Sequence, residues 1–129
     1  MLTATYRNLG YSPWGAVQTE KVIGDGVRLV TTSSHGGFLV TEPALSRMPA
    51  ILKAIVPWAG EGAYEEDVDW AIVILAFPHL FSDSELSSVC KMAIEYDASY
   101  WGGRPRRYVQ DNPAIQSRVE NYRRGSAAV

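Results

Sequence analysis

The sequence has a single cysteine, only two histidines and no long apolar run. One cysteine, Cys90, excludes an internal disulfide; a small buried side chain is the simpler interpretation, and a catalytic thiol is the alternative. The longest apolar run, 71–78, is far shorter than the roughly 20 residues that a membrane-spanning helix needs. The first ten residues lack a basic start followed by an apolar stretch, so we expect no signal peptide. These absences predict a cytoplasmic protein without membrane association.

The composition is that of an ordinary globular protein, with 129 residues of which 47% are hydrophobic and 20% charged. This length predicts a single domain over residues 1–129. The charge is uneven, because residues 1–100 hold six Lys or Arg against twelve Asp or Glu. Residues 101–129 hold six Arg against two acids and form a basic segment with a helical pattern.

The first part of the chain after Trp14 favours strands. Gly24-Asp25-Gly26 is a strong turn signal, because glycine accepts the positive φ angles of tight hairpins. Apolar and polar residues alternate after this turn, and a second turn follows at 33–37. The pattern therefore predicts an antiparallel meander of three strands at 16–23, 27–32 and 38–41.

The remaining sequence favours helices. Ser82 with Glu85 is typical of a capping box, and Asn112 followed by Pro113 is typical of a helix start. The acids before Trp70 would lie in the first turns of a central, buried helix, although 72–75 would also suit a buried strand. We expect helices at about 49–56, 64–77, 82–96 and 112–124, after a short turn at 43–48. The predicted fold class is α+β, with an N-terminal three-stranded antiparallel meander packed against three to four helices.

Two short segments carry groups that suit catalysis or metal binding. In 33–37, a histidine lies between two serines and two glycines, which suits a nucleophile, an anion-binding turn or a plain hairpin turn. The plain turn is the simplest of these, because catalytic triads are built across a fold from distant positions. Glu65, Glu66, Asp67 and Asp69 suit a metal or acid–base work, and a charged helix start explains them equally well. We therefore expect no bound metal, no cofactor and no enzymatic activity, unless His35 converges with the acids in a cleft.

The C-terminal arginines are the third candidate group. They alternate with aromatic residues, a composition that protein interfaces and nucleic-acid-binding surfaces share. A solvated helix that pairs with acids of the same chain is the alternative. The residues predicted to bind a partner are Arg104, Arg106, Arg107, Arg118 and Tyr122, together with Tyr64, Glu65, Glu66 and Asp67.

Four short motifs give the chain a resemblance to a known family. They are Ser12-Pro13-Trp14-Gly15, Ser34-His35-Gly36-Gly37-Phe38, Tyr64-Glu65-Glu66-Asp67 and Trp70-Ala71. Over residues 12–81 the chain resembles an uncharacterised domain of proteobacterial plasmid, phage and other mobile-element proteins. The resemblance implies a bacterial host cell but no activity, and it leaves out the arginines after Phe81.

This context favours a mobile-element accessory protein that acts by stoichiometric binding. We expect an inhibitor of a host defence complex, such as an anti-CRISPR protein, whose partner is a host or phage protein complex. The first alternative is an accessory protein that binds nucleic acid through the C-terminal arginines. The second is a small metal-dependent or hydrolytic enzyme that uses His35 with the acids.

Overall fold

The computed structural model describes residues 10–95 and 101–128, and the side chains among them up to residue 125. Contacts within the chain divide it into two compact units. We call residues up to 47 together with 56–70 the sheet unit, and residues 48–55 together with those from 71 onward the helical unit. The prediction of one domain over 1–129 stays a prediction, because two units of this size also occur within one folding domain.

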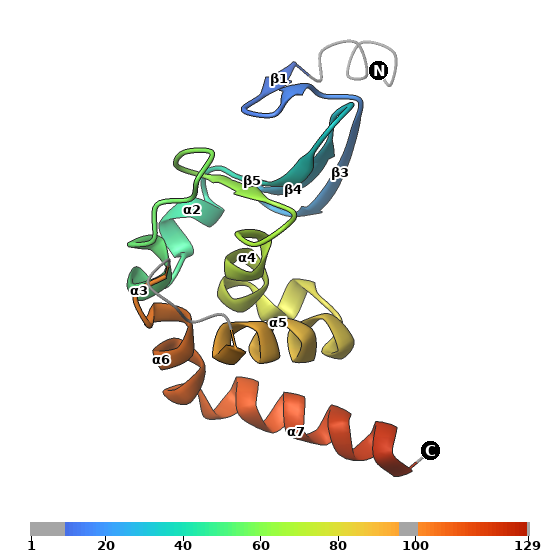
Figure 1. Cartoon of the computed structure of the whole chain (residues 1–129), viewed down its shortest axis with the longest axis vertical. Helices are drawn as coiled ribbons and strands as arrows, with labels where there is room; N and C mark the ends of the chain where they lie inside the picture. The colour runs from blue at the N-terminus through green and yellow to red at the C-terminus, as the bar shows by residue number, and fades with distance from the viewer. Residues whose placement is uncertain (1–9, 96–100, 129) are drawn as a thin grey trace. The chain divides into compact units, whose positions relative to one another are not determined.

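The sheet unit contains a small hairpin and a four-stranded antiparallel sheet in the order β3-β4-β5-β6 (Figure 1). The hairpin joins β1 (Tyr11–Ser12) to β2 (Gly15–Ala16). The sheet comprises β3 (Thr19–Gly24), β4 (Val27–Thr31), β5 (Gly36–Val40) and β6 (Ala63–Glu65), and the short helix α2 (Ala44–Arg47) follows β5. The turn predicted between β3 and β4 is confirmed, with Gly26 at a φ of 89°.

The predicted three-stranded meander is correct for β3, β4 and β5 but lacks the fourth strand. Tyr64 and Glu65, expected at a helix start, pair instead with Phe38 and Gly37 at the edge of β5. The acids that follow form a turn, and α4 begins only at Trp70. The error arises because β6 depends on a partner strand far away in the sequence, which local charge patterns do not reveal.

The two faces of the sheet have different surroundings. On one face Val30, Gly37, Leu39 and Ala63 are neighbours across β4, β5 and β6. Trp14, between β1 and β2, packs with Val30 and Ala63 in a small apolar cluster on this face. On the other face the side chains are also buried, namely Val27, Phe38, Val40 and Tyr64.

The described part of the chain has six α-helices, which is more than the three to four expected. Most of them lie in the helical unit. They are, besides α2, the helices α3 (Ala50–Lys53), α4 (Trp70–Ala76), α5 (Asp83–Glu95), α6 (Arg104–Gln110) and α7 (Pro113–Ala128), with a 3₁₀ turn, η1, at Pro78–Leu80. The helix α6 was not among the expected helices, because the two glycines and the proline of 101–105 suggest a break. Instead, Gly103 adopts a left-handed conformation at the start of α6, and Pro105 lies in the first turn of this helix. Proline suits this first turn, where its missing N–H has no helical acceptor.

Both predicted helix starts are confirmed in the helical unit. The Ser82 N–H donates to Glu85 Oε1 at 3.0 Å, and the Glu85 N–H donates to Ser82 Oγ at 3.1 Å, which is a reciprocal capping box. Asn112 Oδ1 accepts from the Ile115 N–H at 3.2 Å. Within the described ranges, no helix has both the length and the apolar character to cross a membrane.

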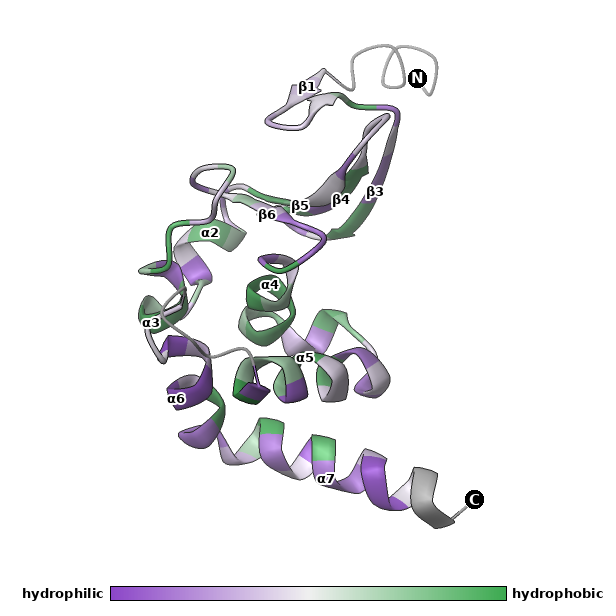
Figure 2. Cartoon of the chain, in the orientation of Figure 1, coloured by the Kyte–Doolittle hydropathy of each residue, from purple (hydrophilic) through white to green (hydrophobic). Residues whose placement is uncertain are grey.

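The segment after Trp70 forms a helix rather than the alternative strand. Hydrophobic residues cover α4 on all sides (Figure 2), and Ile72, Val73, Ile74 and Leu75 are each 0% exposed. A helix that is apolar all round is typical of the interior of a protein. Cys90, on α5, is 3% exposed, which confirms the buried interpretation, and burial raises the pKa of its thiol to about 11.

Candidate functional site

Three of the four sequence motifs meet at one point on the sheet unit. Gly37 lies beneath the Trp14 ring, and a Cβ placed on Gly37 would lie 2.9 Å from Trp14 Cη2 and 2.3 Å from the Tyr64 carbonyl oxygen. The contact with the Tyr64 carbonyl is with backbone and cannot be relieved by a side-chain rotation, so this position requires glycine if β6 is to pair there. Packing therefore explains why these three motifs occur together. The first motif supplies the Trp14 ring, the second supplies Gly37 without a side chain, and the third supplies the strand that contains Tyr64.

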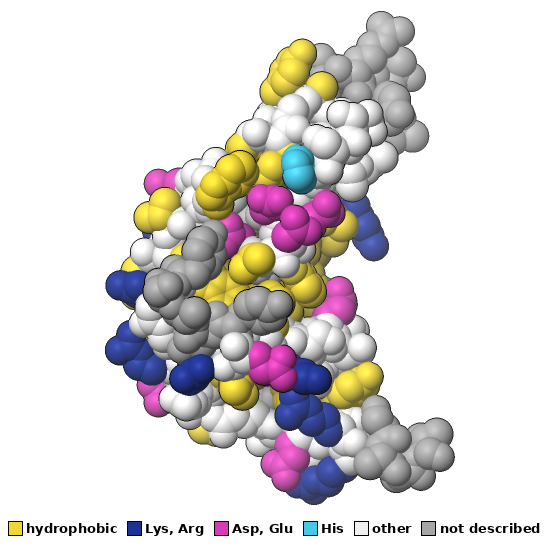
Figure 3. Space-filling model, in the orientation of Figure 1, with side chains coloured by type: hydrophobic (Ala, Val, Ile, Leu, Met, Phe, Trp, Pro, Cys, Tyr) yellow, Lys and Arg dark blue, Asp and Glu magenta, His cyan; other side chains and the backbone are white. Residues whose placement is uncertain are grey.

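His35 and Glu65 come together beside this point. The His35 Nδ1 atom lies 3.6 Å from Glu65 Oε1, and the two side chains are 51% and 17% exposed. Glu66 continues the pairing, because its N–H donates to the Gly36 carbonyl at 2.9 Å. On the surface in Figure 3, acidic side chains gather next to a histidine. The geometry thus brings His35 next to Glu65, which is one part of the convergence in a cleft that the enzyme hypothesis required.

The turn before His35 has the plain structural form that was expected. The Thr32 hydroxyl donates to the His35 carbonyl at 2.8 Å and accepts from the His35 N–H at 3.1 Å. A side-chain hydroxyl that satisfies loose backbone groups in this way is typical of a hairpin turn. Among the described residues, no three His, Cys, Asp or Glu side chains lie close enough together to hold a metal ion.

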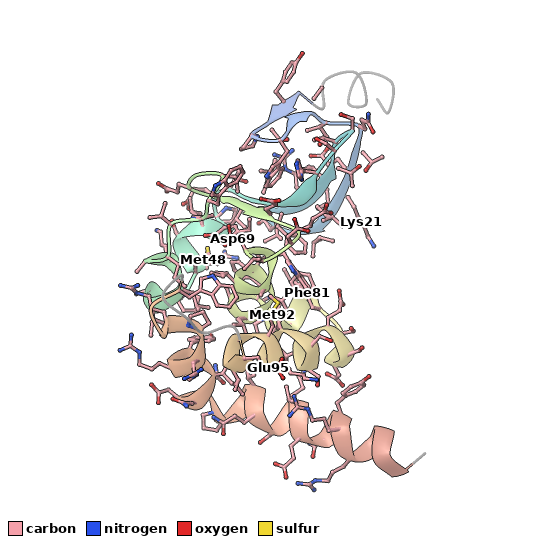
Figure 4. The ribbon with its side chains drawn as sticks, in the orientation of Figure 1. Lys21, Met48, Asp69, Phe81, Met92 and Glu95 are labelled. Carbon is pink, nitrogen blue, oxygen red and sulfur yellow. The ribbon has the colours of Figure 1, made fainter. Side chains whose placement is uncertain are left out.

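An exposed tryptophan lies in the loop that precedes β6. The Trp58 side chain is 76% exposed, and the backbone N–H of Trp58 donates to Asp69 Oδ2 at 3.0 Å. Asp69, just before α4 (Figure 4), is 2% exposed. Two backbone hydrogen bonds also hold this loop. The Gly60 N–H donates to the Pro57 carbonyl at 3.0 Å, and the Ala63 N–H donates to the Gly60 carbonyl at 3.1 Å. Trp58 is not among the residues predicted to bind a partner, because nothing in a sequence distinguishes an exposed tryptophan from a buried one.

The carboxylates around this loop are largely exposed. Glu61, Glu66 and Asp67 are exposed, and Val56, which precedes the loop, is 78% exposed. By sequence the sheet unit carries four Lys or Arg against eight Asp or Glu, and the helical unit carries eight against six. We call Trp58, Glu61, Glu65, Glu66 and Asp67, which lie within residues 58–67 of the sheet unit, the acidic face.

Tyr64 is not available to a partner, contrary to its place among the predicted binding residues. Its side chain is 2% exposed on the buried face of the sheet, because β6 alternates its side chains between the two faces. Burial, together with the nearby carboxylates of Asp69 and Glu61, raises the Tyr64 pKa to about 12. Tyr64 therefore stays neutral and belongs to the interior.

Most of the C-terminal arginines form hydrogen bonds within the helical unit. Arg106 donates to the Ile94 carbonyl at 2.7 Å and Arg107 to the Gly102 carbonyl at 3.3 Å. Arg123 donates to Ser87 Oγ at 3.2 Å, and Arg124 pairs with Glu120 one turn earlier. Five of the six arginines thus have intramolecular acceptors, but only Arg118 and Arg124 of these five pair with an acid, so the alternative of a helix that pairs with acids of the same chain is met in part.

Arg118 is the most heavily bonded of these arginines. Its guanidinium donates to the Pro78 carbonyl at 2.6 Å, to the Phe81 carbonyl and to Asp83 Oδ1. It therefore ties α7 to the connection that enters α5. Replacing Arg118 would disturb the helical unit itself, so it is a poor probe of partner binding. The proposed roles of Tyr122, Arg104, Arg106 and Arg107 in partner binding stay predictions.

The comparisons with known proteins give one match. Residues 7–126 match the family model described as "Domain of unknown function (DUF7007)". No curated protein and no solved structure matches the chain. The expectation of an uncharacterised domain is confirmed, but the matched region is wider than the predicted 12–81 and includes the arginines after Phe81.

Proposed function

We propose that this chain, a member of the DUF7007 family of unknown function, acts as a stoichiometric binding protein. It would bind its partner through the acidic face. The observation that carries this proposal is Trp58, a large aromatic side chain that is 76% exposed on a loop held in place by three hydrogen bonds. Tryptophan is among the residues that contribute most to protein interfaces. A loop that is already ordered loses little entropy on binding.

The partner would present a basic protein surface. Glu61, Glu66 and Asp67 are exposed and follow Trp58 within nine residues along the chain. A tryptophan ring can stack against an arginine of such a surface. The excess of acids in the sheet unit would attract such a surface and speed the encounter. The contacts at the centre would be made by the ring, and the carboxylates around it would set the specificity.

The more specific role rests on the sequence resemblance alone. A small binding protein of a phage or plasmid suits the inhibition of a host defence complex, as in anti-CRISPR proteins. Expression in a host whose CRISPR system targets a phage would then restore plaque formation by that phage. Unchanged plaque numbers would remove this role and leave the binding proposal to be tested separately.

Affinity capture from the bacterial host, followed by mass spectrometry, tests the binding proposal. The tagged wild-type chain should retain one protein or complex in stoichiometric amount, and Trp58→Ala should retain much less of it. Tyr11→Ala is the matched control, because Tyr11 is another exposed aromatic residue of the sheet unit, at 85%. Equal recovery with all three chains would refute the role of the acidic face.

A hydrolytic enzyme is the second candidate, and the contact between His35 and Glu65 favours it. A carboxylate 3.6 Å from an imidazole can orient it as a general base. Hydrolysis of p-nitrophenyl esters or phosphates that is lost in His35→Gln would support this candidate. Nucleic-acid binding has less support, because five of the six arginines that would carry it bond within the chain.

A further inference from the structure

Helices α5 and α7 of the helical unit border a polar groove that the acidic face does not involve. Its volume is about 440 Å³, which lies within the range of small-molecule sites. Most of its lining side chains carry hydrogen-bond donors, and two of them are cations. The polar lining residues are Ser84, Ser87, Ser88, Lys91, Glu95, Tyr122 and Arg123.

One wall of the groove is a single face of α5. Ser84, Ser88 and Lys91 are spaced by four and three residues, so their side chains follow one another along the helix. Lys91 is exposed and has neither an ion pair nor a hydrogen bond within the part of the chain that is described. Its ammonium group is therefore available to an anion.

The second cation comes from α7 and is oriented by a buried hydroxyl. The Nε atom of Arg123 donates to Oγ of Ser87 at 3.2 Å, and Ser87 is 9% exposed. This bond fixes the plane of the guanidinium and leaves its two terminal nitrogens for a ligand. A guanidinium held in this way recognises phosphate oxygens in pairs.

We propose that this groove binds the phosphate of a mononucleotide. Lys91 and Arg123 would neutralise the phosphate, and the hydroxyls of Ser84 and Ser88 would donate to its oxygens. The Tyr122 ring and the side chain of Ile94, which is 51% exposed, give the same groove an apolar part suited to a base. Glu95, one turn beyond Lys91 near the end of α5 (Figure 4), repels an anion and offers an acceptor to ribose hydroxyls.

Calorimetric titration of the full-length chain tests this site. The probes are the four ribonucleoside 5′-monophosphates, the four nucleosides and inorganic phosphate. At least one monophosphate should bind more tightly than its nucleoside and more tightly than inorganic phosphate. Lys91→Gln and Arg123→Gln should each weaken it roughly tenfold, as expected for the loss of one charge-assisted hydrogen bond. Lys53→Gln, on α3 of the same unit, should leave the affinity unchanged.

Several outcomes would overturn the proposal. Absence of binding by every monophosphate would do so, as would equal affinity in Lys91→Gln and the wild type. Lys91 has no internal partner, so its replacement should leave the thermal unfolding curve unchanged, and a folded variant keeps the test decisive. Binding of single-stranded DNA with a steep salt dependence, stronger than binding of any monophosphate, would assign the groove to nucleic acid instead.

Discussion

The most exacting prediction concerns Gly37→Ala. The added Cβ would lie 2.3 Å from the Tyr64 carbonyl oxygen and 2.9 Å from both Glu65 Cα and Trp14 Cη2, whereas ordinary contacts begin at 3.4 Å. Two of these atoms are backbone, so no side-chain rotation relieves them. The strand β6 pairs with β5 through only three residues and has few bonds to resist displacement.

The expected cost is at the upper end for overpacking, about 3 kcal/mol in the free energy of unfolding. Urea unfolding monitored by near-ultraviolet circular dichroism gives this value. The Glu66 amide, which donates to the Gly36 carbonyl, should also exchange its hydrogen much faster in the variant.

Gly125→Ala is the matched control, since a Cβ there meets no atom within 4 Å. It lies in α7, where alanine is a better helix former, so its unfolding free energy should stay equal or rise by up to about 1 kcal/mol. If Gly37→Ala were as stable as the wild type with unchanged exchange at Glu66, the proposed packing of the three motifs would be wrong.

Two further predictions concern stability. Arg118→Ala should lower the free energy of unfolding by about 2 kcal/mol, because it leaves the Pro78 and Phe81 carbonyls without their donor. Arg124→Ala should change the free energy of unfolding by less than about 0.5 kcal/mol, since the pair of Arg124 with Glu120 is exposed. Equal effects of the two variants in urea unfolding would contradict the role of Arg118. The free energy of unfolding should also fall by up to about 2 kcal/mol between pH 10 and 12, because the Tyr64 pKa is raised to about 12 in the folded chain and the unfolded chain loses this proton first. In Tyr64→Phe this part of the decline should be absent. An unchanged decline in Tyr64→Phe would refute the contribution of Tyr64.

Local signals in the sequence were sufficient for much of the fold. The Gly24-Asp25-Gly26 turn, the Ser82 capping box and the Asn112 cap each depend on residues within a few positions of one another. Their geometry follows from the residues themselves, so the sequence predicts them correctly.

Features that depend on distant residues were not predicted. Strand β6 forms because β5 offers an edge, and α6 forms directly after Gly102 and Gly103, which suggest a break. For the same reason, His35 and Glu65 were separate candidates in the sequence, which does not show that they lie 3.6 Å apart. The sequence does not reveal that Tyr64 is buried or that Trp58 is exposed, because the first depends on how β6 pairs with β5 and the second on how the loop before β6 folds.

The central claim, stoichiometric binding through the acidic face, is tested most directly by calorimetric titration of the purified chain against the protein recovered by capture. We expect a saturable complex of fixed stoichiometry, an affinity at least tenfold lower for Trp58→Ala, and an unchanged affinity for Tyr11→Ala. Equal affinities for the wild type and Trp58→Ala, or heat released in proportion to time rather than to added protein, would contradict the claim.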